Sequence, residues 1–389
     1  MPDYLKYKDS RLFWLGQDML EKSKKYNSSV IFFSKKRFFD NLQNAFSLGK
    51  KIQVHYAWKA HYRNDLIDIL NKMSAGVEIM SGKEFLDVTS AGMLPENIIF
   101  NGVGRDIKAL HLAIKSGVKA IVVDNITELD KISKECMALQ KNTRVFFRFY
   151  PFWNNHFRPT SFIKFEYKLG IQNKEELNEM LKIVYSNRFL ELSGLSFHFA
   201  VRNSDGFLHK AGFDNITYFY RNLRNDFKTL KYISIGGGLD SRYLIERKGF
   251  SIRSLLGSIA EKADIMDELE ELIIEPGRFL INDCFIGIST INSVKVLNSF
   301  NWYIIDLSTN FLVPRANSYF EVFPIIKKET SRKEAKFGDG ICSSSSIIGN
   351  SLFLPEMEIG DKVCILNCGA YTQNLASSFG FELPEIIEI

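Results

Sequence analysis

Residues 52–80 read IQVHYAWKAHYRNDLIDILNKMSAGVEIM and hold two β-rich apolar runs, 52–57 and 76–80, around a helical pattern at 64–72. Strands joined through a helix form a βαβ unit, whose two strands pair in parallel. The alternation continues to about residue 275. The strand candidates are 52–57, 76–80, 97–100, 120–123, 144–149, 190–197, 232–235 and 272–275, and the helix candidates are 64–72, 83–91, 108–116, 126–139, 174–185, 216–226 and 252–263. This count predicts a closed (β/α)8 barrel rather than an open sheet.

The rhythm of the chain changes after residue 275. Strand candidates at 278–296, 302–306, 320–326 and 362–366 follow one another without a long helical pattern between them. Such a succession is typical of an antiparallel β domain, which the strand-like run 30–34 could join. The sequence therefore predicts an α/β chain with a barrel domain over 35–275. A mostly antiparallel β domain is expected from 1–34 plus 276–389.

The composition of the chain excludes several classes of protein. Of 389 residues, 46% are hydrophobic and 24% are charged, as in ordinary globular proteins. The net charge of +5 arises from mixed-sign runs rather than a basic stripe, so we expect no nucleic-acid partner. There is no apolar run of about 18 residues and no signal-peptide pattern, so we expect no membrane association. Five scattered cysteines with no matching His pair indicate no disulfide framework, no metal site and a reducing cytoplasm.

Polar and glycine-rich motifs follow several of the predicted barrel strands, where barrel enzymes keep their active sites. Lys59 follows the first strand and His198 the sixth, while glycines 236–238 follow the seventh and Glu-Pro-Gly-Arg at 275–278 follows the eighth. A lysine amine can form an imine, and consecutive glycine N–H groups can enclose an anion. Alone, each motif could instead be a solvent-facing lysine or a tight turn. Together they indicate one site.

In this order, the motifs resemble those of the fold-type III pyridoxal-phosphate decarboxylases. This family includes ornithine, diaminopimelate and biosynthetic arginine decarboxylases, and its barrel is that of the alanine racemases. The resemblance runs from about residue 30 to 381. It rests further on the stretches 76–84, 100–102, 167–171, 354–361 and 369–372 and on Cys342. It implies pyridoxal 5′-phosphate as the cofactor and a carboxy-lyase, that is, a decarboxylase, as the activity.

The resemblance also implies a role for individual residues. Lys59 would carry the cofactor as a Schiff base, His198 would stack on the ring, and Glu275 would contact the ring nitrogen. The phosphate would be held by Gly236, Gly237, Gly238, Gly277, Arg278 and Tyr371. Glu78 and Arg148 occupy places where the family has side chains that support the cofactor.

Two of these residues bear on the reaction. A carboxylate at Glu275 favours a protonated ring, which is a strong electron sink, whereas alanine racemases place an arginine there. Glu275 therefore favours decarboxylation over racemisation. Cys342 resembles the cysteine that the family donates across a dimer interface to help reprotonate the α-carbon. This likeness implies a head-to-tail homodimer with composite active sites.

The substrate is less well indicated, because the chain departs from the family after Cys342. Relatives that bind a distal amine usually have an acidic residue next, but here Ser343 to Ser346 follow, and hydroxyls cannot neutralise an ammonium. Arg315 lies near the place of an arginine that binds a distal carboxylate. A neutral or anionic distal group is therefore favoured, as in the citryl-amino acids of carboxylate-siderophore biosynthesis.

Four alternatives stay open. The first is a diaminopimelate- or ornithine-type decarboxylase of a free diamino acid. The others are an amino-acid racemase on the same fold, a non-catalytic homologue that only binds the cofactor, and, ranked last, an unrelated barrel hydrolase or metal enzyme.

Overall fold

The computed structural model describes residues 4–150, 168–199, 206–313 and 320–389. The chain divides into two compact units. The barrel unit comprises Leu42–Asp240 and Phe250–Gly277, and the β unit comprises Met1–Asn41, Ser241–Gly249 and Arg278–Ile389.

The barrel unit is built on a closed ring of parallel strands. The strands are β5 (Ile52–Ala57), β6 (Gly76–Ile79), β7 (Ile98–Phe100), β8 (Ala120–Val123), β9 (Thr143–Arg148), β10 (Leu190–Ser196), β11 (Tyr232–Ser234) and β12 (Glu271–Ile274). They pair in the order β10-β11-β12-β5-β6-β7-β8-β9, and the ends of this row also pair through β9 and β10. Each strand matches a predicted one, and the predicted parallel barrel is confirmed.

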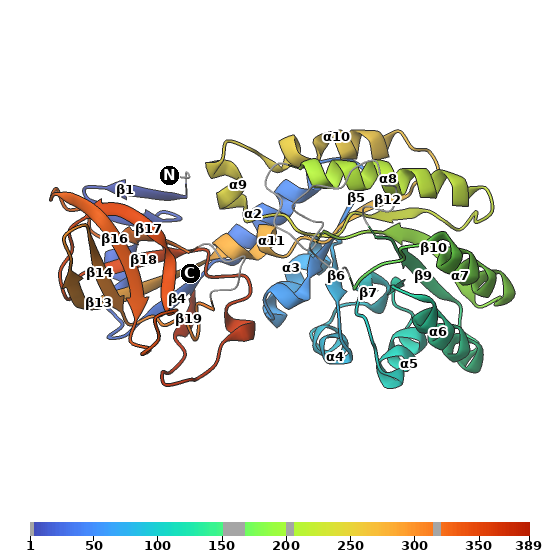
Figure 1. The fold of residues 1–389 in the computed structure, drawn as a ribbon, viewed down its shortest axis with the longest axis horizontal. Coiled ribbons are helices and arrows are strands. Elements are labelled where there is room, and N and C mark those ends of the chain that lie inside the picture. The colour runs from blue at the N-terminus through green and yellow to red at the C-terminus, as the bar shows by residue number, and fades with distance from the viewer. Residues whose placement is uncertain (1–3, 151–167, 200–205, 314–319) are drawn as a thin grey trace. The chain divides into compact units, whose positions relative to one another are not determined.

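Helices surround the strands of the barrel unit (Figure 1). They are α3 (Ile67–Lys72), α4 (Gly82–Ser90), α5 (Ile107–Ser116), α6 (Ile126–Leu139), α7 (Lys174–Ser186), α8 (Phe207–Arg224) and α10 (Ile252–Asp264). Asp106, Asn125, Asn173 and Ser251 cap the starts of α5, α6, α7 and α10 by accepting a backbone N–H from the first turn. Helix α8 begins nine residues before the predicted start at 216, because its first turns bury His209 and Gly212 instead of an apolar stripe.

The inside of the barrel is filled. Ile99, Val122, Phe146 and Ile273 belong to one buried cluster that joins β7, β8, β9 and β12. Two strands lie between β12 and β7 in the ring, and two lie between β12 and β9, so these contacts cross the barrel. Because the interior is packed with side chains, a ligand can reach the barrel only at the strand ends.

The β unit is mostly antiparallel. Its main sheet follows the order β15-β18-β13-β14-β16-β17. Strand β4 (Val30–Phe33), from the start of the chain, pairs with both β13 (Phe285–Val296) and the C-terminal β19 (Glu385–Glu388). A β domain made from both chain ends, as predicted, is therefore confirmed, although β14–β16 and β4–β19 are parallel pairs.

The remaining elements complete the described chain. They are β1 (Leu5–Lys8), β2 (Arg11–Trp14), β3 (Gln17–Asp18), α1 (Met19–Ser23), α2 (Lys35–Phe46), α9 (Arg242–Arg247), α11 (Arg278–Ile281), β14 (Phe300–Ile305), β15 (Glu321–Pro324), β16 (Arg332–Asp339), β17 (Ile347–Pro355) and β18 (Lys362–Leu366).

The start of the β unit differs from the sequence prediction. A strand was expected over 278–296, but residues 278–281 form the short helix α11, and the strand begins at Phe285. The run Arg278-Phe279-Leu280-Ile281 is apolar after its first residue, and an apolar run this short fits a buried helix turn as well as a strand. Strands β16 and β17 were not predicted, because β16 carries five charged residues in its eight positions.

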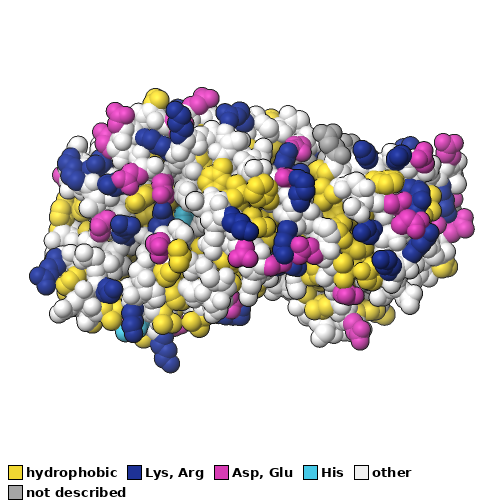
Figure 2. All heavy atoms as spheres, turned by 180° about the vertical axis from the view of Figure 1, so that it is seen from behind, with side chains coloured by type: hydrophobic (Ala, Val, Ile, Leu, Met, Phe, Trp, Pro, Cys, Tyr) yellow, Lys and Arg dark blue, Asp and Glu magenta, His cyan; other side chains and the backbone are white. Residues whose placement is uncertain are grey.

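Charges of both signs are interspersed on the face shown in Figure 2, where Lys and Arg side chains stand among Asp and Glu. Among the described residues, no helix is long and apolar enough to cross a membrane.

Candidate active site

Lys59 and Glu78 form an ion pair at the C-terminal end of the barrel strands. Lys59 lies in the single turn Trp58–Ala60 after β5, and its Nζ is 2.8 Å and 2.6 Å from the two carboxylate oxygens of Glu78. Glu78 belongs to β6, where it is the register partner of Ala57, and its side chain is only 1% exposed. The strand pairing therefore places this carboxylate beside the lysine.

Glu275 follows β12 and is held by neighbours at both oxygens. The Ser234 hydroxyl, at the end of β11, donates to Oε1 at 2.6 Å, and the Asn101 side-chain amide, after β7, donates to Oε2 at 3.3 Å. Arg148, the last residue of β9, makes a long contact of 3.5 Å from Nη1 to Asn101 Oδ1. Residues at the ends of four strands, β7, β9, β11 and β12, are thus linked in one hydrogen-bond network that includes Glu275.

The site concentrates negative charge in a dry environment. Burial raises the pKa of Glu275 to about 7, and the neighbouring carboxylate of Glu78 adds to this effect. The Ser234 hydrogen bond and the positive charges of Lys59 and Arg148 act in the opposite direction. Lys59 therefore lies next to two buried carboxylates, whose charged forms would stabilise a further cationic group.

The glycine loop after β11 is fixed by two histidines. The N–H of Gly237 donates to Nδ1 of His198 at 3.1 Å, so a neutral His198 ring carries its hydrogen on Nε2. His209, buried in α8, donates from Nε2 to the carbonyl oxygen of Gly237 at 2.7 Å. Gly237 is therefore held at both its backbone donor and its backbone acceptor.

Only glycine fits in this loop. A Cβ on Gly236 would lie 2.5 Å from His198 Nδ1, and a Cβ on Gly237 would lie 2.4 Å from the Glu275 carbonyl oxygen. Gly236 and Gly238 also have φ values of +64° and +85°, which side chains rarely allow. The loop is thus a bare backbone cradle directly beside His198 and Glu275, as a phosphate-binding loop requires.

Other predicted site residues lie in or next to the β unit. Gly277 is buried at the end of the barrel unit, and Arg278 opens α11. The Arg278 guanidinium lies 4.6 Å from the centre of the Tyr371 ring, and Tyr371 has a φ of +59°. The structure therefore brings together two residues that were predicted to hold the phosphate.

The predicted substrate residues follow strand β16. Cys342 and Ser343 are exposed, Ser346 is half-buried, and the hydroxyls of Ser343 and Ser345 lie 2.8 Å apart. Arg315 lies outside the described residues.

Sequence reasoning gave no role to Ser234, Asn101 or His209. Asn101 was part of a matching stretch, but nothing in the sequence connects it to Glu275, which is 174 positions away. A short polar residue at the end of a predicted strand is the signal that could have singled out Ser234 and Asn101. His209 lies inside a helix and offers no such signal.

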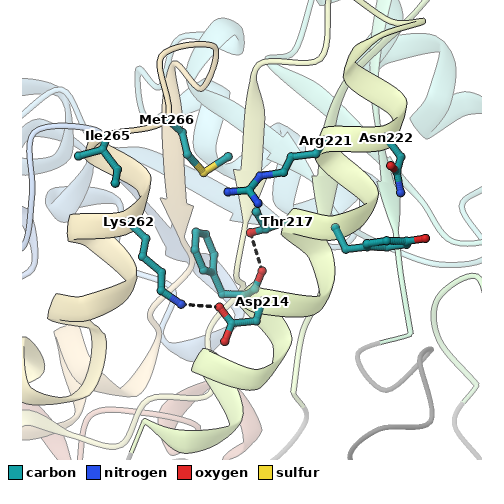
Figure 3. A pocket seen from close by; sticks show the side chains of 9 residues that line it. Asp214, Thr217, Arg221, Asn222, Lys262, Ile265 and Met266 are labelled. Atoms are coloured by element: carbon teal, nitrogen blue, oxygen red, sulfur yellow. Dashed lines mark hydrogen bonds and ion pairs between the residues drawn. The ribbon is translucent and has the colours of Figure 1, made fainter.

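A hollow of about 470 Å³ lies elsewhere in the barrel unit, between α8 and α10 (Figure 3). Figure 3 shows Asp214, Thr217 and Arg221 along one side of α8, with Lys262 of α10 bonded to Asp214. None of the predicted site residues lines this hollow.

Comparison with known proteins identifies the class. Residues 35–282 match the family model described as pyridoxal-dependent decarboxylase, pyridoxal binding domain. The chain is 26% identical to diaminopimelate decarboxylase of Aquifex aeolicus, over 99% of this chain and 92% of the relative. It is 24% identical to L-glutamyl-[BtrI acyl-carrier protein] decarboxylase of Niallia circulans, over 87% and 82% of the two chains. The crystal structure of diaminopimelate decarboxylase from M. jannaschii superposes with a TM-score of 0.89 at 22% identity, covering 99% of this chain and 92% of that one.

The site combines a lysine, two buried carboxylates and a glycine loop at the strand ends of a parallel barrel. This combination is typical of barrel enzymes whose cofactor carries a reactive carbonyl group. The chain belongs to the pyridoxal-dependent decarboxylase family. It is therefore a pyridoxal-phosphate-dependent carboxy-lyase that acts on an amino-acid-type substrate. The family assignment favours decarboxylation over the racemase alternative.

The raised pKa of Glu275 predicts how the stability of the cofactor-free protein depends on pH. The folded state holds the Glu275 proton up to about pH 7, whereas an ordinary carboxyl group releases it near 4.5. The contribution of Glu275 to stability is therefore full below pH 4.5 and is lost as the pH rises to 7, by on the order of 1–3 kcal/mol. Glu275→Gln should reduce this loss, as measured by melting temperatures from pH 5 to 8.

Glu84, Asp124 and Glu128 are also buried with raised pKa values, so the variant should reduce the pH slope without removing it. The exposed Glu268→Gln serves as the control. An unchanged slope in Glu275→Gln would show that Glu275 is ionised in the folded protein throughout this range.

Proposed function

We propose that the protein removes the α-carboxylate from an amino acid whose distal end is joined to another group, such as a citryl-amino acid. The observation that carries this proposal is the neutral segment after Cys342, where amine-binding relatives have acids. The site residues and their roles below are part of the same proposal.

The barrel residues fit pyridoxal phosphate. The bare cradle of glycines 236–238, with Gly277, Arg278 and Tyr371, would hold the phosphate. Lys59 would attach the cofactor through Nζ, His198 would cover one face of the ring, and Glu275 would contact the ring nitrogen. Glu78, which accepts from Lys59, and Arg148, which reaches Asn101, would support this arrangement. When bound, the cofactor supplies the electron sink for the electrons that CO2 leaves behind.

Side chains of the protein would carry out the other parts of the reaction. Glu275 is acceptor-only when it is ionised, and it then stabilises a positive charge at the ring nitrogen. His198 donates no proton from Nδ1, because this atom accepts from Gly237, and the ring is thereby kept in one orientation. Lys59 and Cys342 are the groups that would return a proton to the α-carbon after CO2 has left.

The segment after Cys342 presents no carboxylate. Residues 342–350 contain no acidic residue. The nearest one, Asp339, is buried, and its two oxygens accept the backbone N–H groups of Ile341 and Thr309. Ser343 and Ser345 offer only hydroxyl groups, and their two Oγ atoms lie 2.8 Å apart. A distal ammonium would find no countercharge here, whereas amide, hydroxyl or carboxylate groups would find donors.

The relative from Niallia circulans supports a conjugated substrate. Its name states that it acts on a glutamyl group carried by an acyl-carrier protein, so decarboxylation of conjugated amino acids occurs on related chains. Free diamino acids remain the second candidate, because diaminopimelate decarboxylases match nearly the whole chain.

We also propose a head-to-tail homodimer with composite sites and a cytoplasmic location. The exposure of Cys342 in the single chain supports a role at a partner's site. All five cysteines are free, which supports a reducing compartment.

A substrate panel tests the proposal. The purified holoenzyme is incubated with citryl-ornithine, citryl-diaminopropionate, meso-diaminopimelate, ornithine and lysine, and CO2 is measured. The kcat/KM for a conjugate should exceed that for the free diamino acids by about 10²-fold or more, because an ammonium would stay unpaired in the pocket.

The variant Ser343→Asp tests whether the missing carboxylate after Cys342 is the cause of this substrate preference. It places one carboxylate directly after Cys342, so it should raise activity on free diamino acids and lower activity on conjugates. Release of CO2 from free diamino acids alone would refute the proposed substrate class and leave the decarboxylase assignment intact.

A further inference from the structure

Ser234 is a fully buried serine whose hydroxyl links Glu275 to the glycine loop of the proposed cofactor site. Its hydroxyl donates to Glu275 Oε1 at 2.6 Å and accepts from the N–H of Gly236 at 3.2 Å. A hydroxyl has a single hydrogen, and a backbone N–H can only donate. An ionised Glu275 can only accept, so the serine hydrogen is then directed at the carboxylate.

We propose that Ser234 is a positioning residue, which favours the ionised form of the Glu275 carboxylate, orients it and couples it to the glycine loop that would hold the phosphate. This inference rests on the proposed role of Glu275. It adds a residue outside the predicted site, from a strand that contributes no other side chain to it.

The surroundings of Glu275 explain why one hydroxyl matters. Burial and the carboxylate of Glu78 favour the protonated form, while Lys59 and Arg148 oppose it. The Asn101 amide contact at 3.3 Å is longer than the Ser234 contact at 2.6 Å. Removing the serine hydroxyl takes the shorter of these two donors from a carboxylate that is only 4% exposed. The pKa of Glu275 then rises further, because the charged form loses its hydrogen bond.

The neighbouring strand provides a matched control. Ser196 of β10 is the register partner of Ser234, and it is 3% exposed. Among the described residues its hydroxyl has no hydrogen-bond partner. Ser196→Ala and Ser234→Ala thus remove the same atom from the same level of the barrel, but only one of them removes a bond to Glu275.

The test compares cofactor binding and pH dependence. Pyridoxal phosphate is titrated into the cofactor-free forms of Ser234→Ala, Ser234→Thr and Ser196→Ala, followed by absorbance, and kcat/KM is measured against pH on the loaded enzymes. In Ser234→Ala, cofactor affinity should fall about tenfold. The acidic limb of the profile should move to higher pH by about one unit, because Glu275 must be ionised to act. Ser234→Thr keeps the hydroxyl and should restore both properties, and Ser196→Ala should match the wild type.

The variant Glu275→Gln separates this inference from the proposed function. If Glu275→Gln changes affinity and pH profile while Ser234→Ala behaves like Ser196→Ala, the role of Ser234 is refuted and that of Glu275 stands. If Glu275→Gln also leaves both properties unchanged, the proposed role of Glu275 is refuted, and that of Ser234 with it.

Discussion

Replacing Lys59 by alanine should abolish the absorption band near ~420 nm that a lysine-bound pyridoxal cofactor gives, and should lower decarboxylation by at least about 10³-fold. Lys59 is the lysine that the barrel holds beside the Glu78–Glu275 pair, with its Nζ within 2.8 Å of both Glu78 oxygens. Without its amine, the cofactor has no covalent anchor and the substrate amine has nothing to displace.

Loss of the lysine charge would also destabilise the fold, because the buried Glu78 carboxylate would be left without its partner. Lys59→Arg separates the two effects, since a guanidinium keeps the charge but cannot form the imine. It should fold like the wild type and still lack the band. Lys83→Ala, an exposed lysine at the start of α4, is the control and should keep both the band and the activity. Normal turnover by Lys59→Arg would exclude Lys59 as the attachment point.

Glu275→Arg should lower kcat for decarboxylation by about 10²–10³-fold, the size of effect seen when a single well-placed electrostatic contact is lost. A guanidinium at this position disfavours a protonated ring nitrogen and so weakens the electron sink. The variant is expected to remain folded, because the arginine would lie near Glu78, whose carboxylate already acts on Glu275.

The measurement for this prediction is single-turnover CO2 release at saturating cofactor, which separates chemistry from binding. Glu268→Arg introduces the same charge change at an exposed position just before β12 and should retain the wild-type rate. An unchanged rate in Glu275→Arg would remove the electron-sink argument, and with it the reason to favour decarboxylation on the basis of this residue.

Much of the barrel could be predicted because each strand and helix carries its own local signal. The strands 52–57, 120–123 and 190–197 are short and rich in apolar or β-branched residues. Helices such as α6 and α7 begin with asparagine caps that accept a backbone N–H from the first turn. Such signals lie within a few residues of one another and require no knowledge of the fold.

The β unit was harder to predict for a physical reason. Helix α11 is a single turn whose side chains are apolar after Arg278. Four residues are too few to distinguish the spacing of apolar residues in a helix from that in a strand. Strand β16 is rich in charged residues because its pattern is set by its neighbours β14 and β17 rather than by alternation alone. Pairing partners far along the chain decide such strands.

By itself, the sequence determined which residue types the chemistry needs and their order along the chain. A lysine follows the first barrel strand, a histidine the sixth, three glycines the seventh and Glu275 the eighth. These are local properties, since each residue is placed by the strand that it follows. Only the tertiary structure decided which side chains act on Glu275. Ser234 lies 41 positions from it and Asn101 lies 174 positions from it. Barrel closure brings the ends of β11, β7 and β12 to one place, and no local pattern encodes that meeting.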